Sequence, residues 1–104
     1  MKGLVRMGKY VLAYRGGAMA DTPEEQQAVL AAWGAWFESL GAAIVDGGAP
    51  FGASAAVGGD VVANLTGYSV VAADSLDDAV AKAGGCPILA SGGTVEVYEA
   101  IDMG

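Results

Sequence analysis

Residues 33–51 have the sequence WGAWFESLGAAIVDGGAPF. The large apolar side chains at the start of this stretch recur at spacings of three and four, which predicts one buried face of a helix. Gly41 supplies a left-handed stop to that helix. Residues 42–45 then predict a short strand, and the run Asp46-Gly-Gly-Ala-Pro-Phe51 follows that strand. This run is the best functional lead in the chain, because it places a carboxylate beside a rigid Pro-Phe pair.

Upstream of this stretch, the sequence predicts a strand and the start of the helix. Residues 9–15 are rich in aromatic and branched side chains and end at Gly16-Gly17, which predicts a strand. Thr22-Pro-Glu-Glu25 supplies a capping oxygen, a proline at the first helical position and a glutamate. The glutamate carboxylate can accept a hydrogen bond from the backbone N–H of the capping residue. The apolar face of the helix, which begins with Val29 and Leu30, is expected to be buried.

Downstream, a similar unit follows a glycine-rich connection. Residues 57–61, VGGDV, predict a tight hairpin that forms a flap or an edge extension. Residues 67–72 predict the third main strand, and Ser75-Leu-Asp-Asp78 forms a second capping box that opens a helix. Gly84-Gly85 ends that helix, and alternation in residues 95–98 predicts the last strand. The predicted order is therefore β-α-β, hairpin, β-α-β.

Two such units in one small chain predict a ferredoxin-like α+β domain, in which both helices cover one face of an antiparallel sheet. The other sheet face is then open to water, and an apolar face is unfavourable there. A homodimer that covers this open face is the expected partner arrangement. On the first strand, the open face carries one of two sets of side chains, either Val11, Ala13 and Arg15 or Tyr10, Leu12 and Tyr14.

Length and charge limit the classes of protein to consider. The 104 residues predict one domain, residues 9–104, preceded by a tail, residues 1–8. A net charge of −7 disfavours nucleic acid and anionic membranes as partners, because phosphate binding needs clustered Lys and Arg. Basic residues interrupt the N-terminal region before a signal peptide can form. The lone Cys86 is expected to be a buried small hydrophobe and fits a reducing compartment, so a cytoplasmic location is predicted.

The chain resembles the YCII-related proteins, also called the DGPF-domain family, in its short members. The resemblance follows the pattern TPEE…WGAWFESLG…DGGAPFG…GYSVVAADSLDDAVA…GCP…GGTVEVYE, from about Lys9 to the end. It implies a dimeric α+β barrel, in which two sheets pack face to face, with a cleft beside the sheet. Most members of the family are uncharacterised; a few relatives act on small aromatic compounds as dehydrochlorinases, and one branch has a suggested active dyad of His and Asp. This chain has no histidine, so Asp46 alone corresponds to that dyad, and the DGPF string is interrupted here.

The candidate site residues each have a functional and a structural interpretation. Asp46 is a general base in a cleft or a turn cap. Pro50 and Phe51 form the lip of a ligand pocket or a packing contact. Tyr68, like Tyr14 and Tyr98, orients a polar ligand if it faces the cleft. Otherwise its ring packs in the core and its hydroxyl is exposed to water. Arg15 binds a substrate carboxylate or pairs with Glu96 or Glu99.

These residues leave two hypotheses for function. The first is a homodimeric domain that binds a small molecule or serves as an accessory domain, without chemistry of its own. The second is a cofactor-free lyase or hydrolase that acts on a small cyclic or aromatic compound, with Asp46 as acid or base and Arg15 or a tyrosine holding the substrate. Neither hypothesis calls for a cofactor. No metal is predicted, because the sequence lacks histidine and a cysteine cluster.

Overall fold

The computed structural model of the chain describes residues 7–17, 21–62 and 64–102. Most of the predicted tail, residues 1–8, therefore lies outside the described residues, although the first strand already begins at Gly8. The described elements are, in chain order, β1 (Gly8–Arg15), α1 (Pro23–Leu40), the 3₁₀ turn η1 (Gly41–Ala43), β2 (Ile44–Pro50), β3 (Leu65–Ala73), α2 (Leu76–Ala83), the 3₁₀ turn η2 (Pro87–Ser91) and β4 (Thr94–Ala100).

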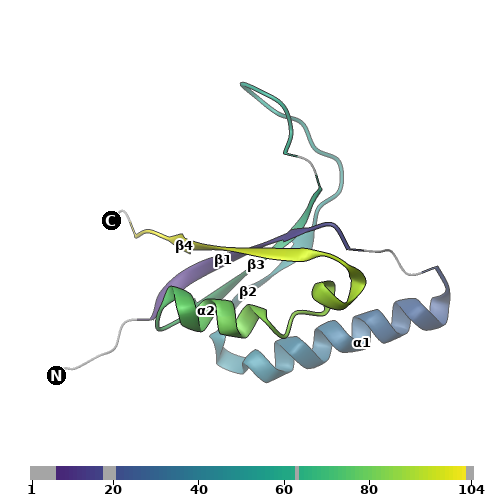
Figure 1. The fold of residues 1–104 in the computed structure, drawn as a ribbon, viewed down its shortest axis with the longest axis horizontal. Helices are drawn as coiled ribbons and strands as arrows, with labels where there is room; N and C mark the ends of the chain where they lie inside the picture. Colours follow the sequence, from purple (N-terminus) through teal and green to yellow (C-terminus); the bar gives the residue numbers. More distant parts are fainter. Residues whose placement is uncertain (1–6, 18–20, 63, 103–104) are drawn as a thin grey trace.

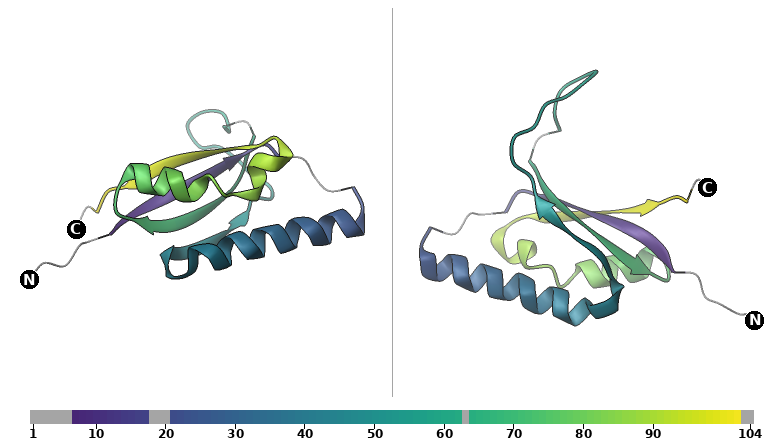
Figure 2. Two further views of the ribbon diagram at one scale, coloured as in Figure 1. Left: turned by 60° about the horizontal axis from the view of Figure 1, so that its bottom comes forward. Right: turned by 180° about the vertical axis from the view of Figure 1, so that it is seen from behind.

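The described strands form one antiparallel sheet in the order β2-β3-β1-β4. Both helices lie on the same side of this sheet, as Figures 1 and 2 show. The α+β class is thus confirmed, and the strand order is compatible with a ferredoxin-like arrangement. The two central strands, β1 and β3, carry Tyr14 and Ser69 on the side of the sheet that faces the helices.

Both helices begin at the capping boxes that the sequence predicts. Thr22 Oγ1 accepts a hydrogen bond from the N–H of Glu25 at 3.1 Å, and Ser75 Oγ accepts one from the N–H of Asp78 at 3.0 Å. The reciprocal bonds are also present, because the carboxylates of Glu25 and Asp78 accept from backbone N–H groups just before each helix. These local signals determine where each helix starts.

The core lies between the sheet and the helices. Tyr10, Leu12 and Tyr14 of β1 are all buried, so the open face carries Val11, Ala13 and Arg15. This resolves the two alternatives for the parity of β1. The helix-facing core is completed by Ser69, Val71 and Ala73 of β3, Ala79 and Ala83 of α2, and Trp36, Cys86 and Ile88.

The expectation that the whole apolar face of α1 is buried is wrong. Within α1 only Trp36 is buried, whereas the side chains of Val29 and Leu30 are 42% and 71% exposed. The reason is geometric, because the N-terminal part of α1 extends past the strands (Figures 1 and 2). Periodicity predicts which side of a helix is apolar, but not how far another element reaches along it.

The inserted hairpin is not formed as predicted. Within the described residues 52–62 there is no strand, and the segment projects from the sheet on the side opposite the helices (Figure 1). We call residues 52–62 the arm. Gly58 and Gly59 do adopt positive φ at its tip, as a turn there requires. Residues 52–56 are Gly, Ala and Ser, which have low strand propensity, so no ladder forms there.

Candidate functional site

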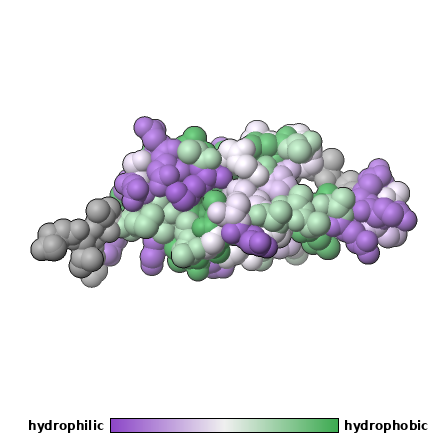
Figure 3. All heavy atoms as spheres, turned by 90° about the horizontal axis from the view of Figure 1, so that it is seen from below, coloured by the Kyte–Doolittle hydropathy of each residue, from purple (hydrophilic) through white to green (hydrophobic). Residues whose placement is uncertain are grey.

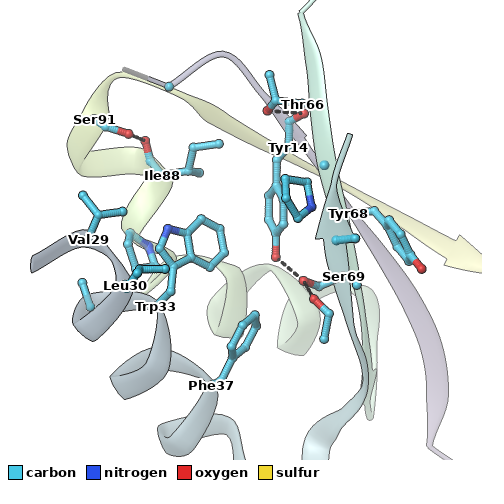
Figure 4. Close-up of a pocket in the computed structure, with 18 of the residues that line it drawn as sticks. Tyr14, Val29, Leu30, Trp33, Phe37, Thr66, Tyr68, Ser69, Ile88 and Ser91 are labelled. Atoms are coloured by element: carbon cyan, nitrogen blue, oxygen red, sulfur yellow. Dashed lines mark hydrogen bonds between the residues drawn. The ribbon is translucent and has the colours of Figure 1, made fainter. Parts of the chain in front are cut away.

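A cleft of about 860 Å³ separates α1 from the sheet. One wall comes from α1 and η2, and the other from the end of β1 and the facing parts of β2 and β3, as Figure 4 shows. Its lining is mostly apolar or glycine, and none of the described lining residues carries a charge. The helix side of the molecule also has apolar surface between hydrophilic patches at its two ends (Figure 3).

The aromatic face of α1 both anchors the helix and forms the cleft. Trp36 is buried and its indole Nε1 donates to the carbonyl of Lys82 at 3.1 Å, which ties α1 to the end of α2. Trp33, one turn earlier, packs edge-on against Tyr14, with ring centroids 5.2 Å apart. Phe37 packs beside Trp33 at 5.9 Å. Trp33 and Phe37 therefore provide a wall of rings that is suited to a flat apolar ligand.

A hydrogen-bonded chain crosses the sheet side of the cleft. The hydroxyl of Tyr14 donates to Ser69 Oγ at 2.7 Å, and Ser69 Oγ donates to the carbonyl of Gly47 at 2.7 Å. Tyr14 is 5% exposed and Ser69 is fully buried. Burial raises the pKa of Tyr14 to about 12, so its hydroxyl is protonated at neutral pH.

Cys86 lies in the core, beside the hydroxyl of Tyr14. It is 3% exposed, and burial raises the pKa of its thiol. This agrees with the expected role of a buried small hydrophobe rather than a reactive thiol.

The structure places Asp46 in a turn at a break in the β2 ladder. The register of β2 against β3 shifts between Asp46 and Ala49. Asp46 Oδ1 accepts a hydrogen bond from the N–H of Gly48 at 2.8 Å, which is the turn-capping interpretation of this residue. Gly48 has φ of +76°, and a Cβ there would collide with the carbonyl oxygen of Tyr68. Gly48, the second glycine after Asp46, thus permits this close approach of the two strands.

Asp46 is exposed and is not among the described residues that line the cleft. Its Oδ2 accepts a hydrogen bond from the hydroxyl of Tyr68 at 3.3 Å. The ring of Tyr68 points away from the cleft in Figure 4, on the face opposite α1. The carboxylate that the sequence singles out is therefore separated from the cleft by the sheet.

Arg15 also lies on the open face. Its Nε donates to Glu96 Oε1 at 2.8 Å, in agreement with the ion-pair interpretation. The hydroxyl of Tyr98 donates to the same carboxylate oxygen at 2.8 Å. The adjacent Arg15 guanidinium lowers the pKa of Glu96. The structure thus groups Arg15, Glu96 and Tyr98 into a polar cluster away from the cleft.

Pro50, Phe51 and Tyr68 border the cleft. The ring of Phe51 stacks on the ring of Tyr68, with centroids 5.8 Å apart. Of the three strand tyrosines considered from the sequence, Tyr14 is the one whose hydroxyl lies on the helix side of the sheet.

The sequence interpretation missed Ser69 and the lining from η2, such as Ile88 and Ser91. Ser69 had a detectable signal, because it shares the strand parity of Gly67 and Val71 and is polar on the face that must be buried. The lining from η2 had none, because this turn reaches the cleft only through its tertiary position.

Among the residues described, no group of three or more His, Cys, Asp or Glu side chains gathers as a metal site would require. Within the same ranges, no helix is long and apolar enough to cross a membrane. Comparison with protein-family models, with curated proteins and with solved structures found no match. The site is therefore defined by its own geometry, as an uncharged aromatic cleft on an α+β domain.

Proposed function

We propose that this chain is a YCII-related, homodimeric protein that binds a small, uncharged aromatic compound in the cleft between α1 and the sheet. The observation that carries the proposal is the aromatic wall of Trp33 and Phe37, which packs against Tyr14 and lines an apolar cleft. Ligand sites typically combine a mostly apolar lining with a few placed polar groups. The Tyr14 hydroxyl, which is hydrogen-bonded to the buried Ser69, supplies such a polar group here.

Binding without chemistry is favoured over the lyase or hydrolase alternative. General acid-base catalysis needs a group within hydrogen-bonding reach of the substrate and a pKa near the working pH. Asp46 lies across the sheet and caps a turn, and the Tyr14 pKa of about 12 keeps that hydroxyl protonated. A ligand in the cleft thus meets a stable hydrogen-bonding surface rather than a proton acceptor that is ready to react.

The homodimer is proposed to form through the open face of the sheet. Val11 and Val70, which are paired in the register of β1 and β3, lie near its centre. On the sheet itself the charges of this face balance, with Lys9 and Arg15 against Asp46 and Glu96, although the whole chain carries −7 and the arm adds Asp60. Two copies can therefore approach through this face with less repulsion than elsewhere. The arm projects on the same side and adds exposed valines there.

A ligand screen followed by thermal unfolding tests the binding function. Indole, as a simple flat aromatic probe, is expected to raise the melting temperature by selective binding to the folded state. Trp33→Leu, which removes the ring but keeps an apolar side chain, is expected to reduce indole affinity by about tenfold.

Leu76→Ala provides a matched control for that experiment. Leu76 is 49% exposed at the start of α2 and is not among the described residues that line the cleft. Its replacement is expected to leave indole affinity unchanged. Equal losses in Trp33→Leu and Leu76→Ala, or no stabilisation by any small aromatic compound, would contradict the proposed function.

A further inference from the structure

The hydroxyl groups that line the cleft share one property. Each donates its proton to an acceptor within the protein. A carbonyl oxygen can only accept a hydrogen bond. Because Ser69 Oγ lies 2.7 Å from the Gly47 carbonyl, its proton is directed there. Ser69 then accepts from Tyr14, whose single proton is directed to Ser69 Oγ at 2.7 Å, and the buried Cys86 thiol also lies within hydrogen-bonding reach of the Tyr14 hydroxyl. The Tyr14 oxygen therefore has only lone pairs left for a ligand.

The other hydroxyls of the described lining follow the same pattern. Thr66 Oγ1 shares its one proton between the carbonyls of Tyr14 and Gly16, at 3.2 and 3.3 Å. Ser91 Oγ donates to the carbonyl of Ile88 at 3.0 Å. Tyr68 donates to Asp46 on the other side of the sheet. The indole N–H of Trp33 lies on the side of its ring away from Tyr14 (Figure 4).

We infer that the cleft selects aromatic compounds that carry an N–H or O–H donor, and that Ser69 sets this selectivity by holding the Tyr14 proton. The inference rests on the proposed binding function and specifies its ligand class. An anionic ligand would meet no countercharge in the described lining. A ligand with an acceptor alone would face the lone pairs of Tyr14, which is unfavourable in a site of low polarity.

Three bicyclic probes of similar size separate the possibilities. Indole has an N–H donor, benzofuran replaces that group with an oxygen, and quinoline offers a nitrogen acceptor. Isothermal titration calorimetry on the whole chain is expected to show indole binding about threefold to tenfold more tightly than benzofuran, as one hydrogen bond provides. Quinoline is expected to bind most weakly.

Two variants test the role assigned to the Tyr14 proton. Tyr14→Phe removes the acceptor, so the preference for indole over benzofuran is expected to disappear. Ser69→Ala releases the Tyr14 proton, so the hydroxyl can donate to a ligand and quinoline is expected to gain affinity relative to indole. If Ser69→Ala does not fold, the Tyr14→Phe comparison still decides the outcome.

The failures of the two proposals are distinguishable. Equal binding of all three probes by the native protein would overturn the donor selectivity and leave the binding function standing. Retention of the indole preference in Tyr14→Phe would also overturn the selectivity. Failure of every probe to bind at millimolar concentration, as expected if a chain segment or a second copy fills the cleft, would overturn both proposals.

Discussion

Tyr14 joins the core of the protein to its cleft. Its ring contacts Trp33 of α1, and its hydroxyl bonds to Ser69 of β3. The surrounding burial that raises its pKa to about 12 also stabilises the neutral form in the folded protein. One side chain thus connects packing, proton position and the proposed ligand recognition.

A pH dependence of stability follows from this shift. In unfolded chain the tyrosine pKa is about 10, so between pH 10 and the raised pKa of about 12 the unfolded state releases a proton that the folded state keeps. The free energy of unfolding is therefore expected to fall by up to about 1.4 kcal/mol per pH unit in this window.

Tyr14→Phe lacks this contribution, and urea unfolding of both proteins measures the difference. The burial that raises the pKa of Tyr10 is common to both proteins and cancels in the comparison. A constant difference in unfolding free energy from pH 10 to about 12 would show that Tyr14 ionises normally.

Asp46 is expected to contribute to the turn rather than to ligand binding. Asp46→Asn keeps an oxygen that can accept from the N–H of Gly48, so stability should change by less than about 0.5 kcal/mol. Asp46→Ala removes that acceptor at an exposed site and should cost about 1 kcal/mol. Both variants should bind indole like the native protein. A tenfold loss of affinity in a fully stable Asp46→Asn protein would instead place the carboxylate in the site.

At the scale of elements, the irregular part of β2 determines how closely this strand approaches β3. Gly48 combines a positive φ with a backbone contact that leaves no room for a side chain. Its neighbour Gly47 has neither restriction, because a Cβ there meets nothing within 4 Å. The adjacent glycines are thus chemically identical and structurally different.

This contrast gives a matched pair of variants. Gly48→Ala is expected to cost more than about 3 kcal/mol of unfolding free energy, because strain and overlap add. Gly47→Ala is expected to change stability by less than about 0.5 kcal/mol. Chemical denaturation of both variants checks this prediction, and similar costs for the two would show that β2 relaxes away from β3.

The elements differ in how well the sequence predicts them. The helix starts at Thr22 and Ser75 are predicted because their signals lie within a few residues. The exposure of Val29 and Leu30 is not, because it depends on where the sheet ends. The position of Asp46 relative to the cleft depends on strand parity across an irregular ladder, where one residue of slip exchanges the two faces.

At the scale of the molecule, the two faces of the sheet differ in what they carry. The helix side contains the core and the cleft, whereas the open side has small apolar residues with balanced charges. The cleft and the proposed dimer surface therefore lie on opposite sides of one sheet. A variant on one face can test its role without directly contacting the other.

Val70→Asp is expected to convert the proposed dimer to a monomer, because it places unpaired charge at the centre of the open face. Val80→Asp is the matched control, since Val80 is 52% exposed on α2. Analytical ultracentrifugation at micromolar concentration measures both. A native protein that sediments as a monomer at every concentration would remove the dimer from the proposal.

Backbone hydrogen bonds hold the chain at both ends of the arm. Residues could therefore be inserted in the arm without disturbing the sheet. The N–H of Phe51 donates to the carbonyl of Thr66 at 2.8 Å, and the N–H of Gly16 donates to the carbonyl of Asn64 at 2.9 Å. These bonds hold the ends of the arm independently of its tip. Because each doubling of a loop costs only about 0.6 kcal/mol, sequence spliced between Gly58 and Gly59 would leave strand register intact. The arm is thus where evolution, or an engineer, can add a new module to this small domain.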